Sequence, residues 1–320
     1  MTNEEKIKQL REIIYRQLSP LIDRDYVYLD LPYHNNIGDS LIWAGTKAFL
    51  KQFPYKCLYS TNFINYDESQ MNNTSLILLH GGGNFGDLYS CFNDFRKDII
   101  RSHPNRKIII LPQTVYYRDE RNLQADADFY KHYPNVTICA RDQVSYTFLK
   151  QHFTANQILL VPDMAFCISD TGFHTNDSVV KPNLYLKRVD KEYQDCKYIF
   201  PDKVEIHDWP TIEYDPLCYK INRYVQIING KLDHILKTHL KPVMDDWIWK
   251  NLLLPYNVKT GIKFLSRYNK IYTTRLHVAI LSILLHKDSV YLLDNSYGKL
   301  RSFYQTWLRD VSSVKYIAEK

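Results

Sequence analysis

Five short apolar runs constrain the fold of this chain more than any other feature of its sequence. Helix-like stretches such as 40–53, 92–102 and 143–153 separate the runs. Runs that are apolar throughout are typical of strands buried on both faces of a parallel sheet, and their alternation with helices indicates an α/β fold. The runs are VYLDL (27–31), LILLH (76–80), KIIIL (107–111), VTICA (136–140) and QILLV (157–161).

A second series of strands and helices occupies the rest of the chain. It begins with the strand-like run 183–188 and includes a strand, a turn and a helix over 270–285. The segment 171–183, at the junction of the two series, has turn composition and no periodicity, which predicts a linker. A chain of 320 residues is also long enough for two domains. We therefore expect one Rossmann-like domain over residues 1–170 and a second over residues 171–320.

Polar and glycine residues follow each of the first five apolar runs. In open parallel sheets, ligands bind beyond the carboxyl ends of the strands. We therefore predict that these residues form one site at a single edge of the sheet. They are Asn36, Gly38 and Asp39 after the first run, Gly82, Gly83, Asn84 and Asp87 after the second, Gln113 after the third, Arg141 after the fourth and Asp163 after the fifth.

The glycine-rich segment HGGGNFGD (80–87) begins at the end of a strand-like run. Its three consecutive glycines would let backbone amides approach an anion or a sugar without obstruction by side chains. The segment lacks the Lys-Ser/Thr pair of a P-loop and the spacing of GxGxxG, so neither ATP nor NAD is indicated. The alternative is a turn that needs glycine only for its backbone geometry.

The segment TTRLHVAI (273–280) places Arg275 and His277 at a junction between a strand and a helix. Exposed amides and the helix dipole favour anions at such a junction, and arginine adds a two-pronged donor for phosphate or carboxylate. A histidine with an unperturbed pKa of ~6.5 donates or accepts a proton near neutral pH. Because the two lie together in a second Rossmann-like unit, we interpret them as site residues rather than as packed or capping residues.

Charged residues near the strand ends allow more than one interpretation. Arg141 follows a buried strand, so its guanidinium must reach solvent or pair with a carboxylate, and we interpret it as anion-binding. We interpret the adjacent Asp142 as the cap of the next helix. Asp39 would act either as a base or hydroxyl-binding group or only as a partner of a helix dipole. The same alternatives apply to Asp163.

The charge and cysteine patterns exclude several classes of protein. The net charge of +6 is spread along the chain without a dense basic arm, so we expect no nucleic-acid partner. The six cysteines form no CxxC pair and have no matching histidine spacing, so we expect no metal site. The sequence shows neither a secretory signal nor a run of ~20 apolar residues, and we expect a cytoplasmic protein.

One basic and aromatic segment raises the question of membrane contact. Six lysines and arginines lie between Lys220 and Lys250, with Trp247 and Trp249 at the far end. Apolar residues at helical spacing over 221–236 predict a helix in this segment. The segment would rest peripherally on a membrane, or it would be a solvated helix face with its tryptophans in the core.

The ordered set NNIGD, LHGGGNFGD, LPQT, ARD, VPD and TTRLHVAI resembles the polysaccharide pyruvyl transferase family. The resemblance spans 27–299, which is most of the chain. It implies two Rossmann-like domains that face a central cleft, as in glycosyltransferases of the B type. It also implies transfer of the enolpyruvyl group of phosphoenolpyruvate to a sugar of a surface-polysaccharide precursor, as a pyruvate ketal. We further expect the last helix to pack back on the N-terminal domain.

The resemblance also implies roles for individual residues. Arg141 and Arg275 would bind the phosphate and carboxylate of phosphoenolpyruvate, and His277 would be the acid or base. Asp39 is then a candidate to orient or deprotonate the sugar hydroxyls, and Lys299 is a candidate to offset the charge of the departing phosphate. The residues expected to bind substrate, with no cofactor besides the donor, are Asn36, Gly38, Gly82, Gly83, Asn84, Asp87, Gln113, Asp163, Leu276 and Lys299.

The sugar acceptor is left open, because the segment 172–268 carries no motif that the resemblance covers. The family implies a lipid-linked sugar at the inner face of the cytoplasmic membrane. A nucleotide-sugar-dependent glycosyltransferase would use the same two-domain architecture, and a non-catalytic assembly scaffold would keep the fold. The presence of Arg141, Arg275 and His277 together favours a transferase over a scaffold.

Overall fold

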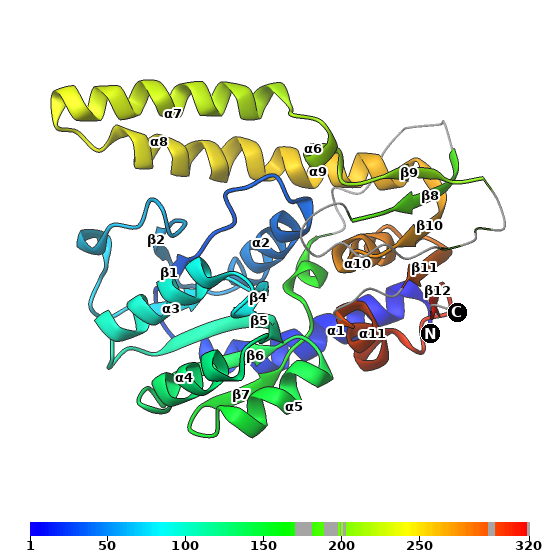
Figure 1. Ribbon diagram of the computed structural model, residues 1–320, viewed down its shortest axis with the longest axis horizontal. Helices are drawn as coiled ribbons and strands as arrows, with labels where there is room; N and C mark the ends of the chain where they lie inside the picture. Colours follow the sequence, from blue (N-terminus) through cyan, green and yellow to red (C-terminus); the bar gives the residue numbers. More distant parts are fainter. Residues whose placement is uncertain (170–180, 189–197, 199, 201–202, 294–297, 319–320) are drawn as a thin grey trace.

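The computed structural model describes residues 1–169, 181–188, 198, 200, 203–293 and 298–318. Within these residues the strands form two separate parallel sheets with helices packed around them (Figure 1). The first sheet has seven strands in the order β2-β1-β3-β5-β6-β7, with β4 paired to β5. The second has five strands in the order β12-β11-β10-β8-β9. The protein is therefore a mixed α/β structure, as the alternation of strands and helices predicts.

The first sheet contains all five of the predicted apolar runs as strands. The runs 27–31, 76–80 and 136–140 are buried throughout because helices cover the sheet, which explains why both faces of these strands are apolar. The strands are β1 (Tyr26–Leu29), β2 (Cys57–Ser60), β3 (Leu76–Leu79), β4 (Gly82–Gly86), β5 (Ile108–Tyr116), β6 (Val136–Ala140) and β7 (Gln157–Leu160). The helices are α2 (Ile37–Leu50), α3 (Ser90–Ser102), α4 (Glu120–Lys131) and α5 (Gln143–His152), with 3-10 turns η2 (Glu68–Gln70) and η3 (Met164–Cys167).

The second sheet and its helices come from the rest of the chain. Helix α8, the π-helical segment η5 and helix α9 follow one another without a break. The preceding helix α7 lies alongside α8, and the two form a long hairpin (Figure 1). The strands are β8 (Lys181–Leu186), β9 (Glu205–His207), β10 (Tyr268–Thr273), β11 (Ser289–Leu293) and β12 (Val314–Ile317). The helices are α6 (Pro210–Glu213), α7 (Leu217–Leu236), α8 (Leu240–Ile248), η5 (Trp249–Leu253), α9 (Leu254–Ser266), α10 (Leu276–Leu284), α11 (Lys299–Phe303) and η6 (Tyr304–Leu308).

Helix α1 (Asn3–Leu18), followed by the turn η1 (Ser19–Leu21), ties the two halves of the chain together. Its apolar face, which includes Leu10 and Ile14, is buried against η3 of the first half and α10 of the second. The terminal ammonium group of Met1 donates to the backbone carbonyl of Asp310, so the two ends of the chain lie close together. Buried residues from both halves consequently belong to one continuous apolar core.

Helix α2 packs directly on the backbone of η3 through Gly45. A Cβ atom at Gly45 would lie 1.9 Å from the carbonyl oxygen of Met164. We expect Gly45→Ala to lower the free energy of unfolding by more than about 2 kcal/mol, because α2 and the backbone of η3 must move apart.

Gly230→Ala on α7 is a matched control, since its Cβ would meet only Lys241 Cδ at 3.6 Å, and alanine should stabilise that helix by up to about 1 kcal/mol. Urea unfolding measures both, and a Gly45→Ala protein as stable as the wild type would contradict this packing.

The glycine-rich segment forms strand β4 rather than an open loop. Gly82 and Gly86 have φ angles of 140° and 116°, a region that side chains with a Cβ rarely adopt. At Gly86 a Cβ would lie 1.9 Å from the carbonyl oxygen of Tyr116 on the paired strand β5. These two glycines are therefore required for backbone geometry, which is the alternative that the sequence left open. Of the predicted linker, 171–180 lie outside the described residues and 181–183 belong to β8.

The last helical segment contacts the start of α5. Asp142 caps α5 as interpreted from the sequence, accepting a hydrogen bond from the Ser145 amide at 2.9 Å. The Ser302 hydroxyl of α11 donates to the same carboxylate at 2.7 Å, and Trp307 Nε1 of η6 donates to the carbonyl of Arg141 at 2.8 Å. The C-terminal helical segment thus holds the strand end that carries Arg141.

Candidate functional site

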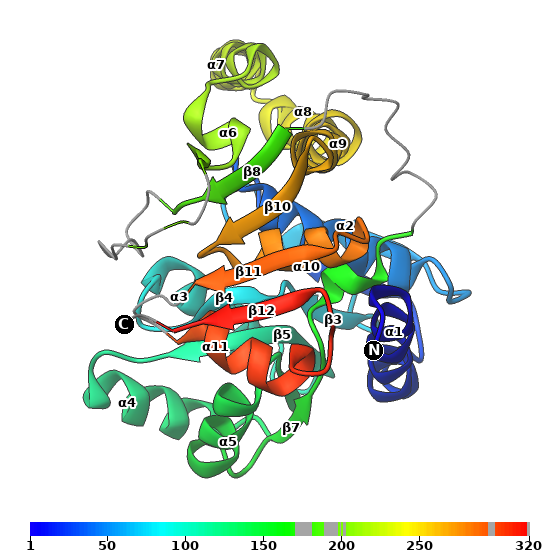
Figure 2. The same ribbon diagram turned by 90° about the vertical axis from the view of Figure 1, so that its right-hand side faces the viewer.

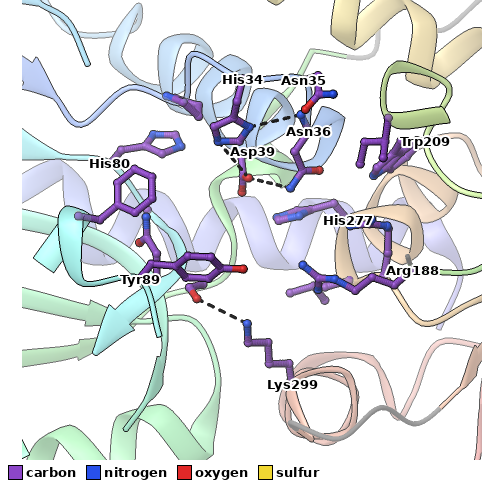
Figure 3. Close-up of a pocket in the computed structure, with 18 of the residues that line it drawn as sticks. His34, Asn35, Asn36, Asp39, His80, Tyr89, Arg188, Trp209, His277 and Lys299 are labelled. Carbon is purple, nitrogen blue, oxygen red and sulfur yellow. Dashed lines mark hydrogen bonds and ion pairs between the residues drawn. The ribbon is translucent and has the colours of Figure 1, made fainter. Parts of the chain in front are cut away.

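A cavity of about 380 Å³ is lined by residues from both halves of the chain (Figure 3). Most of the lining segments follow the carboxyl ends of parallel strands, where open α/β sheets bind ligands. The first half contributes the ends of β1, β3 and β6, and the second contributes the ends of β8 and β10. The cavity brings together nine residues that the sequence predicted for the site: Asn36, Asp39, Gly83, Asn84, Arg141, Arg275, Leu276, His277 and Lys299.

The start of helix α2 holds Asp39 at the cavity. Asn36 caps the helix by accepting a hydrogen bond from the Gly38 amide, and its side-chain amide donates to Asp39 Oδ2 at 2.8 Å. His34 Nε2 lies 3.6 Å from the same oxygen. Burial would raise the pKa of Asp39, but His34 and the other neighbouring cationic groups hold that pKa below its ordinary value. Asp39 is therefore a carboxylate that can accept hydrogen bonds from a ligand.

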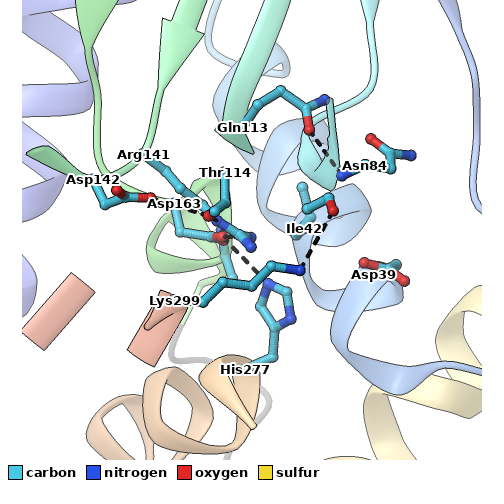
Figure 4. A network of polar contacts seen from close by, with 12 residues as sticks. Asp39, Ile42, Asn84, Gln113, Thr114, Arg141, Asp142, Asp163, His277 and Lys299 are labelled. Carbon is cyan, nitrogen blue, oxygen red and sulfur yellow. Dashed lines mark hydrogen bonds and ion pairs between the residues drawn. The ribbon is translucent and has the colours of Figure 1, made fainter. Parts of the chain in front are cut away.

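A single carboxylate oxygen links the arginine of the first half to the histidine of the second (Figure 4). Asp163 Oδ2 accepts from Arg141 Nη1 at 2.9 Å and lies 3.2 Å from His277 Nε2. Burial would raise the pKa of Asp163, but the His277 imidazole and the Arg141 guanidinium outweigh it and hold the pKa well below its usual range. Asp163 thus fixes the positions of two side chains that line the cavity, while itself lying beneath them.

Two predicted glycines make room for the charged side chains of the site. A Cβ at Gly38 would lie 2.5 Å from His277 Nδ1, so α2 and the imidazole are in close contact. A Cβ at Gly83 would lie 3.1 Å from Lys299 Nζ and 3.2 Å from Arg141 Nη2. Side chains at these positions would displace the cationic groups.

Arg275 is held by a carboxylate that sequence analysis missed. The residue precedes helix α10, and its Nε and Nη2 atoms donate to the two oxygens of Asp208 at 2.6 and 2.5 Å. Both side chains are buried. Such a two-point pair fixes the plane of the guanidinium. No local motif marks Asp208, because the pair joins positions 67 residues apart.

Asp30 and His80 place further polar groups at the cavity wall. Asp30 Oδ2 accepts from Arg96 Nη2 at 2.7 Å, whereas its Oδ1 and His80 Nε2 have no hydrogen-bond partner among the described residues. Burial raises the pKa of Asp30 to about 6 despite the neighbouring Arg96. Burial also lowers the pKa of His80 to about 3, and its Nδ1 lies 2.5 Å from the Tyr28 hydroxyl. A single Asp within the apolar run VYLDL is the signal that could have identified Asp30.

We expect the buried His80 to make stability fall on acidification. Its folded pKa lies below the ordinary 6.5, so its contribution is complete above pH ~6.5 and is lost as the pH falls toward about 3. The free energy of unfolding of the wild type should fall between pH ~6.5 and ~5, and in His80→Gln this fall should be smaller by about 2 kcal/mol. Urea unfolding of both proteins at both pH values measures this difference. Asp30 titrates in both proteins, so its contribution cancels in the comparison. Parallel pH profiles would contradict a buried neutral imidazole.

Five predicted site residues do not line the cavity. Gly38, Gly82 and Asp163 lie behind the lining residues. The Asp87 carboxylate accepts from the backbone amides of Arg118 and Asp119, which precede α4. Gln113 donates from Nε2 to the carbonyl of His80 at 2.7 Å, and its Oε1 accepts from the Asn84 amide at 3.4 Å. Asp87 and Gln113 therefore hold the backbone around the site. Their position after a strand does not by itself distinguish this role from ligand binding.

The lining also includes residues that the sequence analysis did not propose. His34, Tyr89, Arg188 and Trp209 are among them and are labelled in Figure 3. In the part of the chain that the structure describes, no group of three or more His, Cys, Asp or Glu side chains is arranged to hold a metal ion. Among the same residues, no helix has both the length and the hydropathy that crossing a bilayer requires.

Comparison with known sequences identifies the relatives of this chain. The family model described as polysaccharide pyruvyl transferase matches residues 36–297. The chain belongs to the polysaccharide pyruvyl transferase family. It is 33% identical over 320 residues to "Putative pyruvyl transferase EpsO" of Bacillus subtilis (strain 168), a match that covers 98% of this chain and 93% of that protein. It is 26% identical over 301 residues to "Pyruvyl transferase 1" of Schizosaccharomyces pombe, covering 88% of this chain and 69% of that protein.

Family membership supports a transferase that acts by pyruvyl transfer in polysaccharide biosynthesis. A solved structure with a similar fold is that of a functionally uncharacterised protein, KP1_0663, from Klebsiella pneumoniae. The two superpose with a TM-score of 0.63 at 20% identity, over 97% of this chain and 98% of that chain. At that identity the likeness concerns the fold alone, and it agrees with the mixed α/β architecture described above.

Proposed function

We propose that this pyruvyl transferase takes the enolpyruvyl group of phosphoenolpyruvate and attaches it to a sugar of a surface-polysaccharide precursor as a cyclic ketal. The observation that carries the proposal is the meeting of Arg141, Arg275, Lys299 and His277 at one cavity. These side chains come from both halves of the chain. They supply cationic groups for an anionic donor and an imidazole for proton transfer.

Phosphoenolpyruvate carries close to three negative charges, which the cationic groups of the cavity would balance. Arg141 and Arg275 are held in place by Asp163 and Asp208, so little side-chain entropy is lost when the donor binds. The amino end of helix α10 lies beside them and favours an anion. Lys299, whose Nζ lies 3.5 Å from the Gly83 carbonyl, would offset the charge of the leaving phosphate.

The reaction begins in this proposal with protonation of the methylene carbon of phosphoenolpyruvate by His277. The central carbon then has oxocarbenium character, and a sugar hydroxyl adds to it with loss of its proton. Phosphate leaves, a second hydroxyl adds with loss of its proton, and the products are the ketal and inorganic phosphate. Asp163 contacts His277 Nε2 at 3.2 Å and orients the imidazole for the first step.

The acceptor would bind against the carboxylate and aromatic side chains that line the same cavity. Asp39 offers carboxylate oxygens that accept from sugar hydroxyls, whereas the Asp30 carboxylate and His80 Nε2 are buried in the cavity wall. Tyr89 and Phe92 line the same cavity and present rings on which a sugar can pack. We assign the orientation and deprotonation of the hydroxyls to Asp39.

The domains and the setting of the enzyme follow the same expectation. Residues 1–170 and 171–320 would form two Rossmann-like domains that face the cavity, in the manner of glycosyltransferases of the B type. The acceptor is a lipid-linked sugar, and the enzyme acts in the cytoplasm at the inner face of the membrane. The net charge of +6 is compatible with weak attraction to an anionic membrane surface.

Phosphate release measured with purified protein tests the proposed reaction. We expect release only when phosphoenolpyruvate and a sugar acceptor are both present. Mass spectrometry of the product should give an increase equal to pyruvate less one water. Phosphate released at the same rate without acceptor, or an acceptor whose mass does not change, would contradict ketal formation.

A further inference from the structure

The hairpin of α7 and α8 turns a row of apolar side chains away from the protein. On α7, five residues repeat at intervals that place them on one helix face, and their exposed fractions range from 53% to 71%. We call Leu217, Ile221, Tyr224, Ile228 and Ile235 the apolar stripe. The 20 residues of α7 extend over roughly 30 Å, and α7 is the outermost helix in both views (Figures 1 and 2).

The face of α7 that packs toward the protein combines Tyr219 and Val225, which contact the apolar core, with polar contacts to α8 and α9. Asn222 donates to Asp245 of α8 at 3.4 Å, and Gln226 donates to Asn222 at 3.2 Å. The Tyr219 hydroxyl donates to Asn257 of α9 at 2.7 Å. A surface helix in a globular protein normally turns its apolar face to the core. On α7 the five residues of the apolar stripe are exposed in addition to that inward face, and they remain open to solvent in the described chain.

The tryptophans of this segment divide between the core and the surface. Trp249 is 5% exposed and stacks on Tyr33, with ring centroids 5.2 Å apart. Trp247 on α8 is 53% exposed. The sequence left open whether this segment rests on a membrane or is a solvated helix face with its tryptophans in the core. Trp249 lies in the core and Trp247 does not, and membrane contact stays a prediction. Aromatic rings such as Tyr224 and Trp247 are suited to the boundary between water and lipid.

Cationic side chains accompany the apolar stripe. Lys220, Lys231, Lys237 and Lys241 form no ion pair with any residue that the structure describes. Three acidic residues lie in the same segment, 217–250, and all have internal partners. Asp233 accepts from the backbone amides of Leu240 and Lys241, Asp245 contacts Asn65 and Asn222, and Asp246 accepts from Tyr33 and Thr61. The outer surface of the hairpin is therefore apolar and positive.

We propose that the apolar stripe and its lysines dock this protein on an anionic lipid bilayer. An amphipathic helix with apolar and cationic groups binds the plane of such a surface through burial and charge attraction together. A second copy of the chain fits less well, because a symmetric interface would bring the same four lysines of both copies together. The lipid headgroups would supply the negatively charged partners that these lysines do not have among the described residues.

The position of the hairpin relates this surface to the cavity. Trp209 and Ile212 line the cavity at the start of α6, and α7 begins shortly afterwards at Leu217. The start of α7 is therefore joined to the cavity lining by only a few residues. A role of docking in delivering a lipid-linked acceptor rests on the proposed function, whereas docking itself does not.

Vesicle co-sedimentation of the full-length protein tests the proposal. Vesicles of phosphatidylglycerol and phosphatidylcholine, and of phosphatidylcholine alone, serve as probes, without donor or acceptor. We expect binding to the anionic vesicles that Ile221→Ser/Ile228→Ser weakens by about tenfold or more. Lys231→Glu/Lys241→Glu should weaken it to a similar extent. The control, Ile64→Ser/Val144→Ser, removes apolar residues outside α7 that are more exposed than Ile221 and Ile228, and it should bind like the wild type.

Three results would overturn the proposal. The first is a wild type that does not bind anionic vesicles, and the second is a stripe variant that binds them as well as the control variant does. The third is a wild-type dimer, detected by sedimentation equilibrium without lipid, that the stripe variant dissociates. Phosphate release with a water-soluble acceptor and no vesicles separates loss of membrane docking from loss of transferase activity. The stripe variant should retain the wild-type rate in that assay.

Discussion

Replacing His277 with alanine is expected to lower turnover by on the order of 100-fold or more, with little change in the affinity for phosphoenolpyruvate. The imidazole lies at the cavity wall, and Asp163 Oδ2 holds its Nε2 at 3.2 Å. In the proposed reaction this group delivers the proton that makes the central carbon electrophilic. The variant leaves both arginines in place, so the donor should still bind. Initial rates of phosphate release at saturating donor and acceptor measure the loss.

His132→Ala is the matched control for that experiment. His132 is exposed, follows helix α4 and does not line the cavity, so its replacement should leave turnover unchanged. Urea unfolding of both variants checks that the fold is retained. Turnover near the wild-type value for His277→Ala would remove His277 from the chemistry, whatever the effect on donor binding.

Replacing Arg141 with methionine is expected to lower the free energy of unfolding by about 3–5 kcal/mol. Arg141 and Asp163 are both buried, and Arg141 Nη1 donates to Asp163 Oδ2 at 2.9 Å. Removing the guanidinium leaves the buried Asp163 carboxylate without its arginine partner. The resulting loss in free energy of unfolding exceeds the net stabilisation that the ion pair itself provides. Urea unfolding at neutral pH measures the change.

A second substitution in the same background separates pairing from packing. Asp163→Asn removes the stranded charge, so the double variant should recover most of the stability that Arg141→Met loses. Arg141→Lys keeps one positive charge but cannot form two parallel hydrogen bonds, and we expect it to raise the KM for phosphoenolpyruvate by about tenfold. A double variant as unstable as Arg141→Met alone would show that lost packing, not the stranded carboxylate, causes the instability.

The strands of the first sheet could be predicted where burial on both faces produces an unbroken apolar run. Strands β1, β3 and β6 are of this kind, whereas β7 was predicted although it is a partly exposed edge strand. The predicted run at 107–111 ends earlier than β5, because β5 continues through buried Gln113 and Thr114, whose polar groups have internal partners. Strands β2 and β9 lie at the sheet edges and are short and partly exposed, so neither carries that pattern.

The two arginines and the histidine of the site could also be anticipated, because residues after parallel strands meet at one edge. Arg141, Arg275 and His277 were identified in this way and line the cavity. Their partners could not all be identified. Asp208 reaches Arg275 only through the folded arrangement of the second sheet. The same limit applies to α7, since helical periodicity predicts an apolar face but does not say whether that face meets the core or the solvent.

Calorimetric titration of the protein with phosphoenolpyruvate identifies the donor of the reaction. We expect phosphoenolpyruvate to bind the wild type and to bind Arg141→Lys more weakly, and we expect no comparable binding of a nucleotide sugar. Tight binding of a nucleotide sugar together with no heat from phosphoenolpyruvate would rule out the proposed donor and would favour a glycosyltransferase.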